Sequence, residues 1–373
     1  MKSLLFVVAF LGVFALLNMY ISKRLIAKLD AKDRTKKLFR LFLILNFVGI
    51  ILYMVGRYYA NMPNTLYFLF SLPIGVLFLL FCTAVIYDIL RTTCTYIPIS
   101  TQRRLFFKKS LDISSLLVAT ALSAKGVYEA TVLRVEDVVV KIKNLKHNYK
   151  IVQLSDIHIG GLVDATYIKK MVHTVNELKP DVVVITGDII DVDISNASKA
   201  LYELSQLKSR YGTYAVVGNH EYFHGITQII SALNAVGIKV LENESIYIGK
   251  EKEGFNLVGV YDVFGYRVNH HIPDINKALE NIESSSPTIL LAHQPRFIDE
   301  VENRVDLMLS GHTHGGQLYP FRALVKLQQP YIDGLHQHNK NLQIYVNKGA
   351  GFWGPPMRLG ASSEITQIRV NAS

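Results

Sequence analysis

Three long apolar runs near the start of the chain limit what it can fold into. They cover residues 4–21, 41–56 and 66–90, and the third contains Pro73 and Gly75. A helix needs about 20 apolar residues to cross a membrane, and membrane helices tolerate proline and glycine. Buried helices of a soluble core are the alternative, but nearly uncharged runs separated by basic loops are more typical of membrane spans. We therefore predict a membrane domain over residues 1–130.

Charge is distributed unevenly along the chain. Residues 1–130 contain 16 Lys and Arg against 5 Asp and Glu, a balance of +11, whereas residues 131–373 contain 24 against 25, a balance of −1. The net charge of +10 therefore comes from the membrane part. Nucleic-acid binding needs a basic face on the binding domain itself, so we expect no nucleic-acid partner. The only cysteines, Cys82 and Cys94, lie in or beside an apolar run. A disulfide framework or a thiolate metal site in the second domain is therefore excluded.

Basic residues in the loops predict how the chain crosses the membrane. Eight Lys or Arg crowd residues 23–40, only Arg57 follows the second run, and five more lie between Arg91 and Lys109. Cytoplasmic loops are the ones that carry such an excess of basic residues. The first and third loops are therefore predicted to be cytoplasmic.

Residues 113–127 decide the compartment of the second domain. This milder apolar stretch follows Gln-Arg-Arg-Leu-Phe-Phe-Lys at 102–108. The combination resembles a twin-arginine export signal, although ordinary cytoplasmic flanking charge is an alternative. If residues 113–127 cross the membrane, four spans place everything after Ala130 outside the cytoplasm, which we favour. If they do not cross, three spans leave the domain in the cytoplasm. Either way we predict a multi-pass protein of the inner cell membrane.

The pattern of residues 131–373 is typical of an α/β domain. Alternation predicts a strand over 132–142, and helical spacing predicts helices over 166–178 and around 197–207. Apolar strands are predicted at 151–154, 181–188, 213–217, 255–260, 288–292 and 305–310. Uniformly apolar strands that alternate with helices indicate a sheet covered by helices.

Polar residues of metal-ligand type follow five of these strands. They are Asp156, His158, Asp188, Asn219, His293, His312 and His314. Because the carboxyl ends of neighbouring strands lie on one rim, we expect these groups to converge. Seven oxygen and nitrogen ligands exceed one tetrahedral site but suit two divalent ions that share a bridging carboxylate, for which Asp188 is placed best. Two such ions can activate water against a phosphoryl group, and His220 can protonate the leaving group.

These separated blocks resemble the signature of the calcineurin-like metallophosphoesterases. The matching segments are Asp156-x-His158, Gly187-Asp188, Gly218-Asn219-His220-Glu221, His293 and Gly311-His312-x-His314. The resemblance implies a four-layer αββα sandwich of two mixed sheets with helices outside. It implies one metal held by Asp156, His158, Asp188 and His314, a second held by Asp188, Asn219, His293 and His312, and His220 as the catalytic acid. The metals would be Mn, Fe, Zn or Mg, since such sites accept each of these.

The sequence segments around the predicted ligands resemble those of a membrane-associated bacterial branch of that family. These segments include Leu291-Ala-His-Gln-Pro295 and Asn347-Lys-Gly-Ala-Gly351, followed by Arg358. Arg358 is a candidate phosphate clamp or, equally, a structural residue. Glu221, Gln317 and Trp353 are candidate walls of the site or packing residues.

We therefore expect a membrane-anchored phosphoester hydrolase that acts on a lipid-linked or cell-envelope phosphate. If the domain is cytoplasmic, the alternative is cleavage of the pyrophosphate of UDP-2,3-diacylglucosamine in lipid A synthesis, as some relatives do. A non-catalytic scaffold is a remote alternative, because such family members usually lack the catalytic histidine or several ligands.

Overall fold

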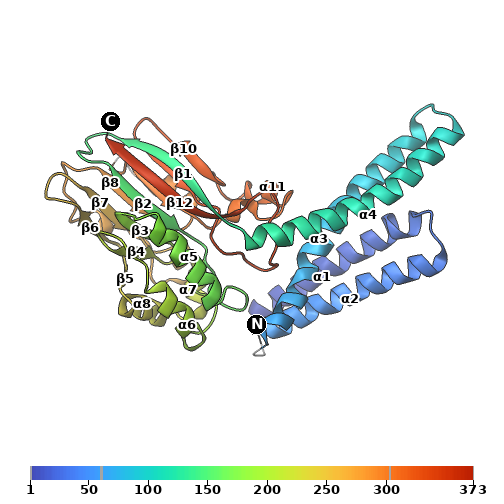
Figure 1. Cartoon of the computed structure of the whole chain (residues 1–373), viewed down its shortest axis with the longest axis horizontal. Coiled ribbons are helices and arrows are strands. Elements are labelled where there is room, and N and C mark those ends of the chain that lie inside the picture. The colour runs from blue at the N-terminus through green and yellow to red at the C-terminus, as the bar shows by residue number, and fades with distance from the viewer. Residues whose placement is uncertain (1, 59–61, 302–303, 373) are drawn as a thin grey trace. The chain divides into compact units, whose positions relative to one another are not determined.

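The chain forms two compact units in the computed structural model, which describes residues 2–58, 62–301 and 304–372. Met1–Glu129 and Trp353–Leu359 make up a helical unit, and Ala130–Phe352 with Gly360–Ser373 makes up an α/β unit. Figure 1 shows the elements of each unit.

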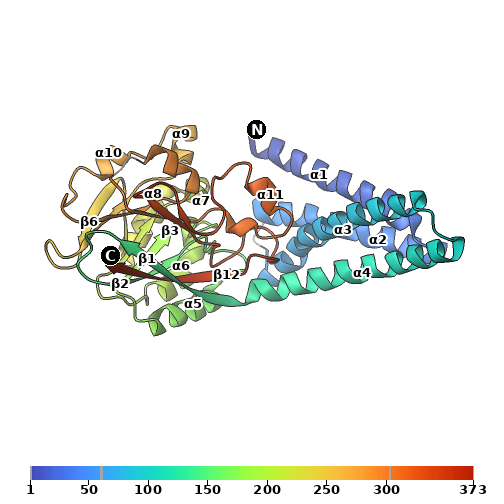
Figure 2. The same cartoon turned by 90° about the horizontal axis from the view of Figure 1, so that it is seen from above.

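Long helices build the N-terminal unit (Figure 2). They are α1 Lys2–Arg24, α2 Asp33–Tyr58, α3 Asn64–Tyr96 and α4 Thr101–Thr131, with the short 3-10 helix η1 Ile26–Lys28 after α1. Each of α1, α2 and α3 contains one predicted apolar run and is long and apolar enough to cross a membrane. Helix α4 contains residues 113–127 as one continuous helix, but it does not meet that standard of apolarity.

Helix α4 runs back along α3. Near one end, Arg91 Nη1 of α3 lies 3.0 Å from Asp112 Oδ1 of α4. Towards the other end, the buried side chain of Met357 lies against both Gly75 of α3 and Gly126 of α4, so closely that an added Cβ at either glycine would crowd it. The end of α4 is therefore directed towards the N-terminal half of α3.

Two six-stranded sheets form the α/β unit. The first has the order β1-β12-β2-β3-β4-β5 and the second β10-β11-β9-β8-β7-β6. In the first sheet, β2 to β5 are parallel, and in the second, β7, β8, β9 and β11 are parallel. The strands are β1 Leu133–Ile142, β2 Tyr149–Leu154, β3 Val182–Thr186, β4 Thr213–Val216, β5 Ile238–Val240, β6 Glu244–Ile248, β7 Phe255–Gly259, β8 Thr288–Leu291, β9 Leu307–Ser310, β10 Gly334–Gln337, β11 Gln343–Val346 and β12 Ser363–Ala372.

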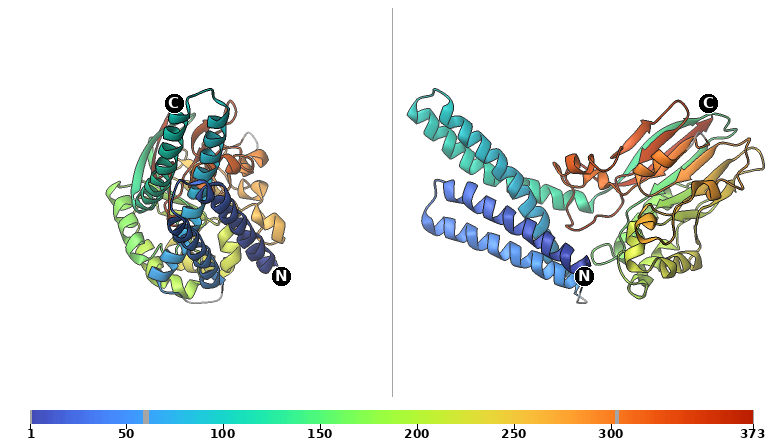
Figure 3. Two further views of the ribbon diagram at one scale, coloured as in Figure 1. Left: turned by 90° about the vertical axis from the view of Figure 1, so that its right-hand side faces the viewer. Right: turned by 180° about the vertical axis from the view of Figure 1, so that it is seen from behind.

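Alternation along the apolar strands divides the core into layers. Val182 and Val184 of β3 pack against the second sheet, in one cluster with Ile289 of β8, whereas Val183 and Ile185 pack against the helices. The outer face of the second sheet packs in turn on its own short helices. Successive side chains of a strand point to opposite faces, so a run apolar at every position is buried on both. Figure 3 shows the strands of both sheets from behind in its right panel, where they overlap in the view.

Short and medium helices cover both outer faces, and the predicted αββα sandwich is thereby confirmed. The helices are α5 Ala165–Glu177, α6 Ile194–Leu204, α7 Asn219–His224, α8 Ile226–Ala235, α9 Phe264–Val268, α10 Ile275–Ala278, η2 Pro295–Glu300, η3 His314–Gly316 and α11 Arg322–Val325. Helix α5 begins after Asp164, whose carboxylate accepts hydrogen bonds from the amides of Thr166 and Tyr167. The second predicted helix is α6, which begins three residues earlier than the 197–207 prediction.

Candidate metal centre

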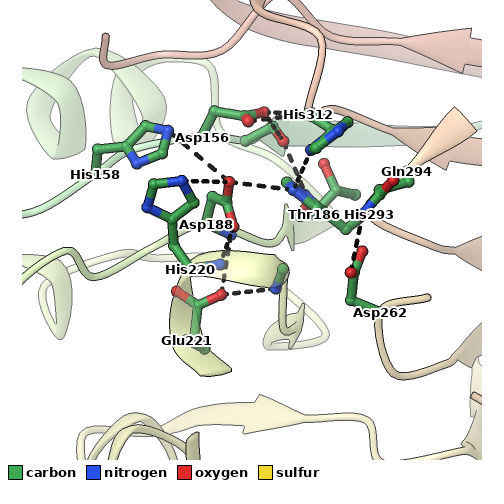
Figure 4. A network of polar contacts seen from close by, with 12 residues as sticks. Asp156, His158, Thr186, Asp188, His220, Glu221, Asp262, His293, Gln294 and His312 are labelled. Atoms are coloured by element: carbon green, nitrogen blue, oxygen red, sulfur yellow. Dashed lines mark hydrogen bonds and ion pairs between the residues drawn. The ribbon is translucent and has the colours of Figure 1, made fainter. Parts of the chain in front are cut away.

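The seven predicted ligands follow the carboxyl ends of five strands. Asp156 and His158 come after β2, Asp188 after β3 and Asn219 after β4. His293 follows β8, and both His312 and His314 follow β9. Strands β2, β3 and β4 are parallel neighbours, as are β8 and β9, so their ends share a rim in each sheet. Figure 4 shows most of these side chains pointing towards one another.

Asp156, His158 and His314 form the first group that can hold a metal ion. His158 Nε2 lies 3.0 Å from His314 Nε2, and His314 Nε2 lies 3.4 Å from Asp156 Oδ1. The other ring nitrogen of His158, Nδ1, lies 3.0 Å from Asp191 Oδ1 and donates its proton there. That hydrogen bond leaves a lone pair on His158 Nε2, aimed at a second imidazole nitrogen. Two nitrogens and a carboxylate oxygen that face one another in this way fit a cation between them.

Asp188, His293 and His312 form the second group. His293 Nε2 lies 3.2 Å from both Asp188 Oδ2 and His312 Nδ1. His293 Nδ1 donates to the carbonyl oxygen of Thr186 at 2.7 Å, which fixes the ring so that Nε2 points into the group.

Asp188 lies between the two groups. Its Oδ2 is 3.2 Å from His293 Nε2 of the second group and 4.0 Å from His158 Nε2 of the first. Its Oδ1 accepts the backbone amide of His220 at 2.8 Å, which fixes the carboxylate plane. Gly218 approaches so closely that a side chain there would collide with this carboxylate. Asp188 therefore lies near a ring nitrogen of each group.

Asn219 begins α7, and a different observation indicates that its side chain is suited to bind a metal ion. Its Oδ1 is buried and accepts no hydrogen bond from any residue that the structure describes. A buried polar atom without a partner is destabilising, which is why nearly all such atoms in proteins are paired. A cation beside it would remove that penalty.

The backbone of the site is unusual. Asp156, His158, Asp188, His312 and His314 all have φ between 50° and 70°. Residues with a side chain seldom adopt this left-handed conformation, which costs about 1 kcal/mol or more each, and such residues cluster at functional sites. The strain is maintained by the surrounding hydrogen bonds, such as those from the His312 amide to both oxygens of Asp156.

Asp191 is a site residue that the sequence prediction missed. Its Oδ1 lies 3.0 Å from His158 Nδ1 and 2.6 Å from His220 Nδ1, so one carboxylate oxygen orients both rings. Burial acts against its ionisation, but His158 and His220 hold the pKa of Asp191 well below its usual value. A second carboxylate three residues after Asp188 was the available signal.

Glu221 supports the site from beneath. Its carboxylate is fully buried and accepts backbone amides of Asp188, Ile189, Ile190 and Gly218 at 2.6–3.1 Å. Four such bonds fix the turns that carry Asp188 and Asn219. Glu221 is therefore a structural residue of the site and not a wall that contacts substrate.

Asp262 was also missed, although it follows the apolar strand β7 as the ligands follow theirs. It is buried, and its Oδ1 accepts from Gln294 Nε2 at 3.0 Å (Figure 4). Burial raises the pKa of Asp262 to about 6. Of the other residues singled out, Arg358 is fully buried and its backbone amide donates to Gly126 at 2.8 Å, which favours the structural role over a phosphate clamp.

In the second group, electrostatic interactions favour the ionised form of Asp188 and the protonated form of His293. Burial would raise the pKa of Asp188, but the imidazoles of His293 and His220 hold it well below its usual value. Burial would likewise lower the pKa of His293, but the Asp188 carboxylate raises it well above its usual value. Burial and the neighbouring His293 lower the pKa of His312 to about 3. Metal binding at such a group displaces the proton that a ligand carries.

Comparison with known proteins connects this geometry to a family. The family model for calcineurin-like phosphoesterases matches residues 149–316. A metallophosphoesterase of Helicobacter pylori is 38% identical over 367 residues and covers 97% of each chain. The chain belongs to the calcineurin-like metallophosphoesterases.

A second relative also has a metallophosphoesterase domain in its name. A Bos taurus protein named as a transmembrane protein with a metallophosphoesterase domain is 37% identical over 73% of this chain and 64% of its own. Among solved structures, a dimetal phosphatase from Danio rerio is similar at 12% identity and a TM-score of 0.36, over 54% of this chain and 87% of that one. Family membership makes the chain a phosphoester hydrolase, and family members use metal ions.

Proposed function

We propose that this chain is a membrane-anchored phosphoesterase with two divalent metal ions. One ion would be held by Asp156, His158, Asp188 and His314, and the other by Asp188, Asn219, His293 and His312. The arrangement of Asp188 Oδ2 carries the proposal, because it lies within 4.0 Å of a ligand nitrogen in each group. Oxygen and nitrogen donors without sulfur suit Mn, Fe, Zn or Mg.

His220 is the proposed catalytic acid. When bound, two divalent ions at these groups would lower the pKa of water and neutralise the oxygens of the phosphoryl group. Because His220 Nδ1 donates to Asp191, its Nε2, 3.8 Å from Asp188 Oδ2, presents a proton when the ring is the doubly protonated imidazolium. From there it can protonate the departing alkoxide.

A membrane anchor over residues 1–130, followed by a catalytic domain over 131–373, is the proposed organisation. Helices α1, α2 and α3 supply three spans by length and composition. Helix α4 returns along α3, as the Arg91–Asp112 and Met357 contacts indicate, and only Val132 separates it from β1. This course supports a fourth crossing and an extracytoplasmic domain at the inner membrane. A lipid-linked or cell-envelope phosphate is then the proposed substrate, and a cytoplasmic nucleotide sugar is disfavoured.

Two experiments test this proposal. The full chain in detergent should hydrolyse bis-p-nitrophenyl phosphate only when it is loaded with metal. The His312→Ala variant should bind less metal and hydrolyse this substrate more slowly. The His173→Ala variant should match the wild-type chain in both respects. His173 is a matched control because its ring is exposed on α5, 3.3 Å from Glu177. Equal activity of the His312→Ala variant would refute the site. A reporter fused after the C-terminus, with and without residues 113–127, reports the compartment.

A further inference from the structure

Residues 318–331, which follow the last predicted metal ligand, expose a row of large apolar side chains. Tyr319 is 43% exposed, Phe321 45%, Leu324 56% and Leu327 80%. Among the described residues of the α/β unit, no other stretch of nine exposes four large apolar side chains. Contiguous exposed apolar surface marks a site of interaction with a protein or a membrane. We refer to these residues as the 318–331 segment.

Hydrogen bonds hold the inner side of this segment to neighbours of the metal ligands. Arg322 Nη1 donates to the carbonyl oxygen of Gly315 at 3.3 Å and pairs with Asp333 at 2.5 Å. Gln329, which is 5% exposed, donates to the side chain of Gln294 at 3.3 Å. Gly315 directly follows His314, and Gln294 directly follows His293. The segment is therefore held by hydrogen bonds to the loops that carry His293 and His314, while its outer face is exposed.

The charge of the 318–331 segment matches a lipid surface. It contains no Asp or Glu, and because Arg322 pairs with Asp333, the exposed Lys326 is the basic group that it presents to a surface. Aromatic and aliphatic side chains next to basic ones are typical of segments that lie in the membrane interface, where anionic headgroups attract the basic groups. Tyrosine is also enriched at that depth.

We propose that the 318–331 segment docks on the bilayer, with Tyr319, Leu324 and Leu327 inserted among the lipids. The inference rests on the proposed membrane anchor, which supplies a bilayer within reach of the α/β unit, since one residue separates α4 from β1. Docking places the metal site at the headgroup layer, because His314 precedes Tyr319 by five residues in the same loop. The substrate class is then a phosphoester whose alkyl chains stay in the membrane during hydrolysis.

The first test measures insertion without relying on activity. Leu327→Trp is made in a Trp353→Phe background, so that the introduced indole is the only one, since the chain has one Trp. The full chain is placed, one copy per nanodisc, in phosphatidylethanolamine and phosphatidylglycerol with or without brominated acyl chains. Brominated lipid should quench Leu327→Trp. Tyr202→Trp in the same background is the control, because Tyr202 is 65% exposed on α6, outside the segment.

Absence of quenching at position 327 would overturn the proposal. So would a blue-shifted emission that appears only when several chains share a disc, because that result would identify a second copy as the occupant of this face. Equal quenching at positions 327 and 202 would likewise overturn it, since docking would then not be specific to the segment.

The second test separates docking from chemistry. Leu324→Ser/Leu327→Ser should slow hydrolysis of hexadecyl p-nitrophenyl phosphate in nanodiscs by about tenfold, as expected when two partly buried leucines are lost from the interface. Hydrolysis of soluble bis-p-nitrophenyl phosphate should be unchanged, which also shows that the variant is folded. Equal rates for variant and wild type on both substrates would overturn docking. A wild-type chain that hydrolyses neither substrate would instead refute the phosphoesterase proposal, while the quenching result would stand.

Discussion

Both units of the chain bury ionisable side chains, but in different ways. In the helical unit, Asp112 of α4 accepts hydrogen bonds from the Tyr87 hydroxyl at 2.7 Å, from Arg91 Nη1 at 3.0 Å and from the amide of Asp30 at 2.7 Å. Asp88 of α3, which is partly buried, pairs with Lys28 Nζ at 2.5 Å. Each carboxylate has a cation beside it, and both lie within regular helices. These groups are satisfied by the protein alone.

The candidate metal centre also pairs a carboxylate with an imidazole, Asp188 with His293, but it leaves a buried polar atom without a partner among the described residues. Imidazole nitrogens of His158 and His314 face each other at 3.0 Å, and the amide oxygen of Asn219 accepts no hydrogen bond among the described residues. Five predicted ligands have left-handed backbone conformations. Buried polar clusters are stabilising only when every member is satisfied. The difference indicates that the first cluster stabilises the fold, whereas the second is arranged for a ligand from outside.

Replacing the bridge should have the largest effect. Asp188→Asn keeps the shape of the side chain and removes its charge, so both ions should bind weakly and hydrolysis of bis-p-nitrophenyl phosphate should fall by about a thousandfold or more. Metal analysis of the purified variant checks the cause. Asp112→Asn, in the cluster of the helical unit, is the control, and this variant should bind as much metal as the wild-type chain. Loss of metal from both variants would contradict the distinction between the two clusters.

Removing the proposed acid should affect only some substrates. His220→Ala should slow esters with alkyl leaving groups by about a hundredfold or more, because a poor leaving group needs a proton in the transition state. Aryl esters with good leaving groups should be affected much less. Rates measured over a series of leaving groups decide the matter, and a uniform loss would remove His220 from the acid role.

Replacing Asp191 should affect both metal binding and protonation of the leaving group, because one of its oxygens contacts His158 and His220. We expect Asp191→Asn to lower metal affinity and alkyl-ester hydrolysis by about 10- to 100-fold, as is usual when the partner of a ligand histidine is lost. Metal titration together with the same series of leaving groups tests this. If only thermal stability changed, Asp191 would belong with the structural pairs of the helical unit.

The smallest effect on catalysis is expected in the helical unit. Asp112→Leu removes three hydrogen bonds and leaves Arg91 without its carboxylate, which should destabilise the folded chain by about 1–3 kcal/mol. Thermal unfolding in detergent measures this loss. The folded fraction should hydrolyse bis-p-nitrophenyl phosphate at the wild-type rate per mole of bound metal, and a reduced rate would mean that the cluster acts on the site.

Local patterns predicted a sheet covered by helices and candidate ligands directly after its strands, and the family resemblance added the four-layer sandwich. Apolar strands buried on two faces are readable from composition, and a polar residue directly after such a strand must lie at the rim of the sheet. Asp188 and His293 were found in this way. Asp262 follows the same rule and was overlooked, so that omission was not a limit of the sequence.

Tertiary structure alone decided how those residues are supported. Asp191 reaches His158 and His220 across 33 and 29 positions of the chain, and Glu221 reaches three consecutive amides beginning at Asp188. Arg358 was an open choice in the sequence, and its complete burial favours a structural role. Contacts of this kind depend on how loops turn after the strands end, and no periodicity in the sequence records that turn. The sequence thus determined which chemical groups arrive at the rim, and the folded loops determined which atoms face each other there.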